Sequence, residues 1–249
     1  MDIWAACKDA AVFEPLAGEL IRIVESQERV ATNALVESLE EQALLEDLIE
    51  ASKPPLPPGT GALHYLLSTP FRYPPLRHGS RFGTRSEPSL FYGSATLDAA
   101  LAEVAYYRFV FWEAMAVPPA SGRFTTEHTV FGARYAARVG ARLQAQPFSA
   151  FEDRLTDPCR YADTQRLGRD LRRAGIEAFE YRSARDPGRG INVALFQSGA
   201  FAEPRPIWQQ QWLGETRGER VTFYGEEHGT RLFPRGAFLV NGALPVPAA

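Results

Sequence analysis

Three residues with chemically useful side chains follow one another at equal spacing between residues 79 and 108. Arg81, Tyr92 and Glu103 stand 11 positions apart. Arginine binds phosphates and carboxylates through directional donors, tyrosine offers a flat ring and a hydroxyl, and glutamate supplies a negative charge. Whether the three act together depends on the elements that carry them.

Glu103 lies in the run "ALAEVAYY", which the sequence predicts to be helical. On a helix its neighbours are the alanines three and four positions before it and the tyrosines three and four positions after it. The small residues leave room beside the carboxylate. Glu103 is therefore either a solvated charge at the edge of an apolar stripe or a group directed into a cleft, and spacing leaves both open.

Arg81 and Tyr92 are equally ambiguous when each is taken alone. Arg81 lies in the glycine-flanked loop "GSRFG", where backbone can approach a ligand closely, although a surface arginine fits there as well. Tyr92 follows Phe91 in "SLFYGS", a predicted short strand, so one ring faces the core and the other faces outward.

The helix that carries Glu103 has clear boundary signals. We expect helix over "LDAALAEVAYYRFVFW", with Thr96 as its N-cap and Asp98 complementing the helix dipole. A second, amphipathic helix is expected over "DTQRLGRDLRRAG", with Gly175 at its C-terminal cap.

A strand, a turn rich in Gly and Pro, and a second strand are expected in "IEAFEYRSARDPGRGINVALF". Ser183 would lie at the exit of the first strand and Asn192 at the start of the second. Two more short strands are expected in "RVTFYGEE" and "FLVNGALPV". The body is therefore predicted to be α+β, with a mixed or antiparallel sheet.

The N-terminal part differs in character from the body. From Glu19 to Ala51 apolar residues recur at three- and four-residue steps, which predicts one bent helix or two helices, ended by "SKPPLPPG". We interpret residues 1–58 as an acidic helical extension with a proline-rich linker, or as a plain arm packed on the body, and residues 59–249 as the body.

Charge and composition limit the classes of function. The chain carries a net charge of −3, but residues 1–52 hold 12 Asp and Glu against three Lys and Arg, so the remainder is basic. Its arginines are scattered rather than clustered in a stripe, and a nucleic-acid partner is not expected. No run approaches a membrane span, no signal peptide begins the chain, and a cytoplasmic location is expected.

Several familiar sites are absent from the sequence. Cys7 and Cys159 are far apart without a CxxC spacing, so neither a zinc site nor a disulfide framework is expected. The chain lacks a GxGxxG fingerprint, a Walker lysine and a GxSxG elbow. We therefore expect no metal and no retained redox cofactor.

The runs "LLSTPFRYPPLRHGSRFGTRSEPSLFYGSATLDAALAEVAYYR" and "EYRSARDPGRGINVALF" resemble the RES domain, a family named for an arginine, a glutamate and a serine. The resemblance extends from about Gly61 to Phe196. It rests on an arginine before a phenylalanine, a strand tyrosine, a helical glutamate, and a serine followed by an asparagine. By position, these residues are Arg81, Tyr92, Glu103, Ser183 and Asn192, and Arg72 in "FRYPP" is a rival for the arginine role.

The resemblance implies a fold and an activity. RES proteins are bacterial toxins of toxin–antitoxin pairs that are similar in fold to ADP-ribosyltransferases and cleave the bond between nicotinamide and ribose in NAD+. It implies that Glu103 stabilises an oxocarbenium-like ribose, that Arg81 or Arg72 binds the pyrophosphate, and that Tyr92 lies against nicotinamide or ribose. Ser183, with Asn192, would position a ribose hydroxyl or the nucleophile.

The resemblance also implies partners. NAD+ would be a substrate, inorganic phosphate a possible second substrate, and a small Xre-like DNA-binding antitoxin a protein partner. The acceptor of the ADP-ribosyl group is left open among water, phosphate and a protein side chain, the last giving a protein ADP-ribosyltransferase. A non-catalytic nucleotide-sensing or partner-binding module is the alternative from another class.

Overall fold

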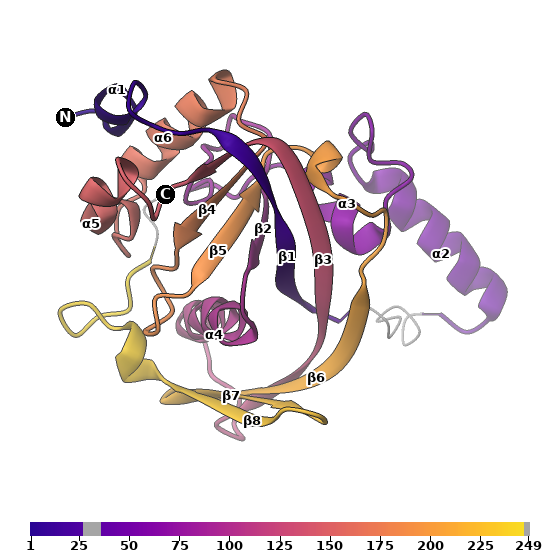
Figure 1. The fold of residues 1–249 in the computed structure, drawn as a ribbon. Coiled ribbons are helices and arrows are strands. Elements are labelled where there is room, and N and C mark those ends of the chain that lie inside the picture. The colour runs from indigo at the N-terminus through magenta and orange to yellow at the C-terminus, as the bar shows by residue number, and fades with distance from the viewer. Residues whose placement is uncertain (27–35, 247–249) are drawn as a thin grey trace.

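A computed structural model describes residues 1–26 and 36–246 of the chain (Figure 1). Within these residues, eight strands form one sheet in the order β1-β2-β5-β4-β3-β6-β7-β8, and an additional pairing joins β1 to β3. That pairing closes the first five strands of the order into a ring. Among the strands of the described residues, only β3 and β4 pair in parallel; every other pair of neighbouring strands is antiparallel. The predicted α+β class with a mixed sheet is confirmed.

The strands are β1 (Glu14–Glu25), β2 (Phe91–Ser94), β3 (Phe124–Arg142), β4 (Ala178–Arg182), β5 (Ile191–Leu195), β6 (Trp208–Thr216), β7 (Arg220–Gly225) and β8 (Gly229–Pro234). The α-helices are α1 (Ile3–Cys7), α2 (Leu39–Ser52), α3 (Tyr65–Arg72), α4 (Leu97–Glu113), α5 (Glu152–Leu155) and α6 (Ala162–Arg173). Short 3₁₀ turns follow β3, β5 and β8.

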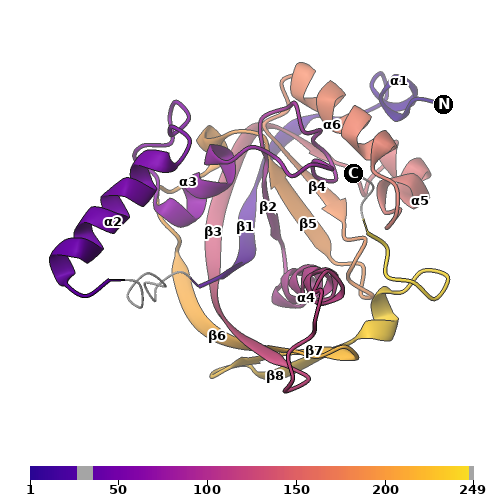
Figure 2. The same cartoon turned by 180° about the vertical axis from the view of Figure 1, so that it is seen from behind.

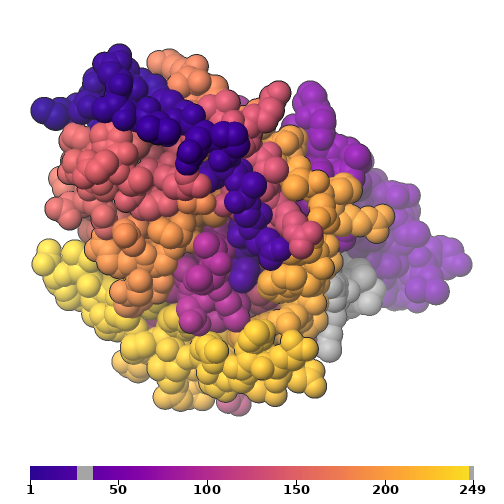
Figure 3. All heavy atoms as spheres, viewed as in Figure 1, coloured from indigo at the N-terminus to yellow at the C-terminus, as the bar shows by residue number. Residues whose placement is uncertain are grey.

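The buried apolar residues of the described ranges form three clusters, and each cluster includes residues of a different helix. One lies between the ring strands and α3, a second lies between β4, β5 and α6, and a third surrounds α4. Figure 1 shows α4 end-on, between the ring and the layer formed by β6, β7 and β8. In Figure 3 part of α4 remains visible between the N-terminal strand and the C-terminal segments.

The helix α4 begins where the sequence predicts. The side chain of Thr96 accepts a hydrogen bond from the amide of Ala99, and Asp98 lies in the first turn. Its buried residues surround the helix axis instead of forming one stripe: Ala99, Ala100, Leu101, Ala102, Ala105, Tyr106 and Phe109. A helix buried on most sides carries few charges, so a carboxylate in its middle turn needs polar partners.

Helix α6 also agrees with prediction, and a glycine brings it close to the loop that holds Arg81. Gly175 has a φ of +78°, the left-handed conformation expected just after a helix. A Cβ on Gly168 would lie 1.9 Å from the carbonyl oxygen of Phe82. Only glycine at position 168 therefore allows this approach, which fixes the loop against the helix.

The strand–turn–strand prediction is confirmed by β4 and β5, and the strand predicted in "RVTFYGEE" is β7. The strand predicted in "FLVNGALPV" is wrong. That segment begins in a 3₁₀ turn and contains only an isolated bridge between Val240 and Ala243.

The helix predicted from Glu19 to Ala51 needs the largest correction. Residues 14–25 form the strand β1, which pairs with β3 from Glu14 to Glu25. The helical prediction is right for α2, while residues 27–35 lie outside the described part of the chain. The division of the chain near residue 58 stays a prediction, but its N-terminal part supplies a strand to the sheet. Within the described residues, no helix has the length and apolar character that crossing a membrane requires.

Candidate active site

A cavity of about 360 Å³ lies where β1, β2 and α4 meet the loops before β2 and α6. Four of the predicted site residues line it together: Arg81, Tyr92, Glu103 and Asn192. Its other polar and aromatic lining residues are Arg22, Ser80, Ser94, Tyr107, Tyr161 and Tyr181. Residues from β1, β2, α4, β4, β5 and the loops before β2 and α6 therefore converge on one space.

Glu103 is held inside this cavity by two hydrogen bonds to the same oxygen. The hydroxyl of Ser183 donates to Oε1 at 2.6 Å, and Nδ2 of Asn192 donates to the same atom at 2.7 Å. Within the described part of the chain, the second oxygen, Oε2, accepts no hydrogen bond. The carboxylate is thus fixed at one oxygen and free to meet a ligand with the other. Of the two interpretations of Glu103, the structure agrees with a group directed into a cleft.

The two donors are themselves oriented. Ser183 is 3% exposed, and its oxygen accepts hydrogen bonds from the amides of Arg185 and Asp186, both at 3.0 Å. With its acceptor capacity used in this way, the hydroxyl proton is directed toward Glu103. Asn192 is fixed in turn because its Oδ1 accepts from the hydroxyl of Ser94 at 2.7 Å. Ser183 does not line the cavity, so it contacts Glu103 rather than the cavity space.

Tyr92 joins the strand β2 to the loop that carries Arg81. Its hydroxyl lies 2.8 Å from the hydroxyl of Ser80 and accepts a hydrogen bond from the amide of Phe82 at 3.2 Å. Burial raises the pKa of Tyr92 to about 12, so the phenol stays protonated at neutral pH. The ring lines the cavity while the hydroxyl anchors the loop.

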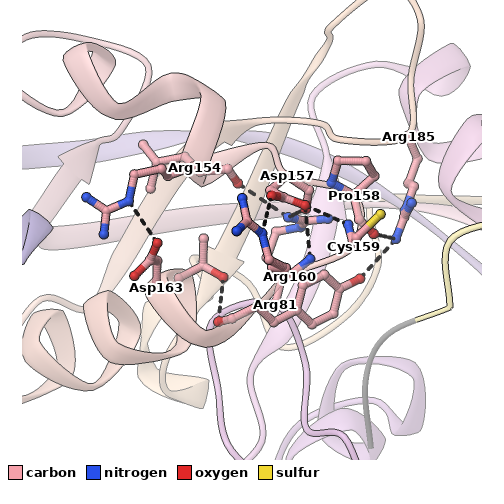
Figure 4. A network of polar contacts seen from close by, with 11 residues as sticks. Arg81, Arg154, Asp157, Pro158, Cys159, Arg160, Asp163 and Arg185 are labelled. Atoms are coloured by element: carbon pink, nitrogen blue, oxygen red, sulfur yellow. Dashed lines mark hydrogen bonds and ion pairs between the residues drawn. The ribbon is translucent and has the colours of Figure 1, made fainter. Parts of the chain in front are cut away.

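Arg81 is fixed by the end of α5 and the segment that follows it. Its Nη1 donates to the carbonyl oxygens of Asp157, at 2.9 Å, and Leu155, at 3.4 Å, and its guanidinium lies 4.6 Å from the ring centre of Tyr161 (Figure 4). The carboxylate of Asp157 stabilises the turn by accepting from the amides of Cys159 and Arg160. These partners include no carboxylate that neutralises Arg81, so its charge remains available to an anion in the cavity.

Tyr161 also contacts a second, buried arginine. Nη2 of Arg185 donates to the hydroxyl of Tyr161 at 3.1 Å and to the carbonyl of Pro158 at 2.8 Å (Figure 4). The guanidinium of Arg185 stacks on Tyr106, 3.6 Å from the ring centre. Arg185 thereby connects the turn after Ser183 to the segment that holds Arg81.

Arg22 on β1 is a cavity residue that the sequence analysis missed. Its Nη1 donates to the carbonyl of Tyr92, and its guanidinium lies 4.9 Å from the ring centre of Phe91. Burial lowers the pKa of Arg22 to about 10, which still leaves it charged at neutral pH. Its enclosed Nε has no hydrogen-bond partner among the described residues. An arginine between isoleucines in "LIRIV" is the signal that could have identified it, but that run was interpreted as helix.

Arg72 does not join the other predicted residues. It ends α3, where Nη1 donates to Glu50 at 2.6 Å and Nε donates to the carbonyl of Pro54. It is not among the residues that line the cavity. The structure therefore brings Arg22, and not Arg72, to the space occupied by Arg81 and Glu103.

Residues 58–214 match the model of the RES domain, and the chain belongs to this family. The resemblance found in the sequence is thus confirmed.

A search of curated proteins finds no match. Among solved structures, the chain is similar to one from M. tuberculosis described as the crystal structure of the MbcT-MbcA toxin-antitoxin complex. The similarity has a TM-score of 0.48 and 11% sequence identity, and it covers 82% of this chain and 88% of that one. Arg22 lies outside the matched residues 58–214.

Proposed function

We propose that this protein cleaves the bond between nicotinamide and ribose in NAD+. The observation that carries the proposal is Glu103: its carboxylate is held by Ser183 and Asn192 in a cavity whose walls also present Arg22 and Arg81. A fixed negative charge facing two cations fits a substrate that carries a diphosphate at one part and develops positive charge at another. The activity implied by the RES family matches both demands.

The proposed reaction needs a fixed carboxylate. As the C–N bond breaks, its electron pair goes to the nitrogen of nicotinamide, which leaves as a neutral molecule, and the ribose carbon becomes oxocarbenium-like. A carboxylate already oriented by two hydrogen bonds stabilises that charge without reorganising during the reaction. Oε2 of Glu103 would face the ribose, because Oε1 is occupied by Ser183 and Asn192.

The arginines would bind the pyrophosphate. Arg81 and Arg22 both line the cavity, and each uses a main-chain carbonyl as partner for one Nη atom. The remaining guanidinium donors are suited to the oxygens of a diphosphate. We assign the diphosphate to these two residues and not to Arg72, whose guanidinium binds Glu50 and Pro54.

Tyrosines from several elements would enclose the rings of the substrate. Tyr92, Tyr107, Tyr161 and Tyr181 line the cavity and offer flat faces to nicotinamide or ribose. Burial raises the pKa of Tyr107 and Tyr181 above the ordinary value for tyrosine, so these hydroxyls stay neutral and add no charge to oppose Glu103. Ser183 would act as a positioning residue through Glu103.

We further propose that the protein acts as the toxin of a toxin–antitoxin pair. This part of the proposal rests on the RES family, whose members are bacterial toxins, and it includes a cognate antitoxin that blocks the cavity. Uncontrolled removal of NAD+ would arrest growth, so such a partner would be needed in the same cell.

The test is to incubate the purified protein with NAD+ and measure free nicotinamide by chromatography. The proposal predicts release, with ADP-ribose as co-product if water is the acceptor and ADP-ribose 1″-phosphate if inorganic phosphate is. Transfer to a protein would instead label an acceptor polypeptide. Binding of NAD+ without release of nicotinamide would contradict the proposal and favour a nucleotide-sensing module.

A further inference from the structure

A second cavity, of about 190 Å³, lies between β1 and α3 and shares Arg22 with the first cavity. Val24, Tyr65, Leu66, Thr69 and Tyr73 supply most of its wall. Apart from Thr69 these side chains are apolar or aromatic, and Tyr65 and Tyr73 are 48% and 40% exposed. The proposed cleavage of the nicotinamide–ribose bond uses none of them.

The sheet itself explains why one arginine reaches both cavities. β1 pairs with β2 at a single position, Ile21 opposite Ser94, whereas it pairs with β3 along its whole length. Beyond Ile21 the strands β1 and β2 part, and Nη1 of Arg22 bridges the gap by donating to the carbonyl of Tyr92. Because side chains alternate along a strand, Arg22 and Val24 lie on one face of β1 and Ile21 and Ile23 on the other.

The chemistry of a dinucleotide fits this arrangement. Its diphosphate lies between two nucleosides, and Arg22 is a cation that lies between two cavities. Nη1 of Arg22 donates to the carbonyl of Tyr92, and the residue lines both cavities, so its charge lies at their junction. A purine needs an apolar space with aromatic walls, which Tyr65, Leu66 and Tyr73 provide.

We infer that the cavity between β1 and α3 binds the adenosine end of NAD+, with Arg22 on the diphosphate and Glu103 at the nicotinamide riboside. This inference rests on the proposed function and assigns the part of the substrate that does not react. Figure 2 shows α3 beside the strands β3 and β1, on the side of the ring away from α6. Binding energy gained at α3 would then hold the reacting ribose against α4.

The direct test measures the binding of ADP, which has the adenosine and the diphosphate but no nicotinamide, by titration calorimetry. Thr69 is exposed on α3, so Thr69→Trp fills the cavity without burying a new group in the core. Tyr73→Ala removes one aromatic wall. We expect each change to raise the Kd for ADP on the order of tenfold.

Ala62→Trp is the matched control, because it adds the same indole at an exposed position just before α3 and outside the cavity. It should leave the Kd for ADP near that of the unaltered protein, and thermal unfolding should show that all three variants are folded. Unchanged ADP binding in both Thr69→Trp and Tyr73→Ala, or no binding of ADP to the unaltered protein, would overturn the inference.

Nicotinamide release from two substrates separates this inference from the proposed function. NAD+ and nicotinamide mononucleotide share the reacting bond, but only NAD+ has the adenosine end. Thr69→Trp should reduce the preference in kcat/KM for NAD+ over the mononucleotide. If the unaltered protein and Thr69→Trp both release nicotinamide from NAD+ with the same preference over the mononucleotide, the proposed function is supported and the adenosine site is contradicted. If the variants bind ADP more weakly but the unaltered protein releases no nicotinamide, the adenosine site is supported and the proposed function is contradicted.

Discussion

The hydroxyl of Ser183 lies 2.6 Å from Oε1 of Glu103, although the two residues are 80 positions apart in the chain. The contact joins the turn after β4 to the middle of α4. We propose that Ser183 positions Glu103 and does not contact the substrate, because Ser183 is buried and does not line the cavity. The first prediction tests that role.

Ser183→Ala should leave Glu103 with one donor fewer and a less defined orientation. We expect kcat for nicotinamide release to fall on the order of tenfold or more, with a smaller change in KM. The amides of Arg185 and Asp186 lose their acceptor, which should cost on the order of 1–3 kcal/mol in free energy of unfolding. Steady-state kinetics and denaturant unfolding measure the two effects separately. Ser198→Ala, outside the cavity, is the control, and equal kinetics in both variants would argue against a positioning role.

The assignment of the diphosphate predicts different behaviour for three arginines. Arg22→Ala and Arg81→Ala should each raise KM for NAD+ on the order of tenfold or more, because the diphosphate is present in both ground and transition states. Arg72→Ala should change KM little, since Arg72 binds Glu50 and Pro54. Steady-state kinetics on all three variants, after a check of folding, gives the comparison. A large KM effect confined to Arg72→Ala would reverse the assignment.

Boundary signals made the helices near the site predictable. Thr96 and Gly175 act within one turn of their own helices, so the local sequence is enough to predict where these helices begin or end. The strand β1 is different. Its residues are compatible with both a helical and an alternating hydrophobic pattern. Pairing with β3, more than 100 residues away in the chain, makes the segment a strand and not a helix. Arg22 could not be recognised as a cavity residue until that strand was known.

The site residues likewise divide into features that the sequence could predict and features that only the fold determines. The types and order of Arg81, Tyr92 and Glu103 were visible in the sequence, and the family resemblance added Ser183 and Asn192. Local spacing could not show that Ser183 and Asn192 converge on one oxygen of Glu103, because that depends on the register of β4 and β5 relative to α4. Nor could it show that Arg72 is held by Glu50.

A buried histidine should make stability depend on pH. His128 on β3 is 1% exposed, and burial lowers its pKa to about 4 from the ordinary value of 6.5. The unfolded chain therefore binds a proton that the folded chain does not as pH falls below about 6.5, so this contribution to stability is lost between about pH 6.5 and 4.

Denaturant unfolding at several pH values measures this effect. The free energy of unfolding attributable to His128 should fall on the order of 2–3 kcal/mol across that range. His128→Asn, which does not titrate, should show a flatter dependence between pH 6.5 and 4. An identical slope in the two proteins would show that His128 does not govern acid stability.

The toxin proposal predicts an effect in cells. Expression of the protein in bacteria without an antitoxin should arrest growth and lower cellular NAD+, since the substrate is consumed and not regenerated. Growth curves and an enzymatic NAD+ assay on the same cultures measure both. The Glu103→Gln protein, expressed to the same soluble level, should do neither. Normal growth and normal NAD+ at good soluble expression of the unaltered protein would count against toxicity.

The most direct measurement is kcat for nicotinamide release by folded Glu103→Gln at saturating NAD+. Glutamine keeps the size of the side chain and an oxygen that accepts from Ser183 and Asn192, but it removes the charge that would face the ribose. We predict a fall in kcat on the order of 100-fold or more with a smaller change in KM. Asp98→Asn, the same change at an exposed position of α4, should retain normal kcat. Near-normal release by Glu103→Gln would contradict the account, because Glu103 would then be no more than an ordinary carboxylate on a helix.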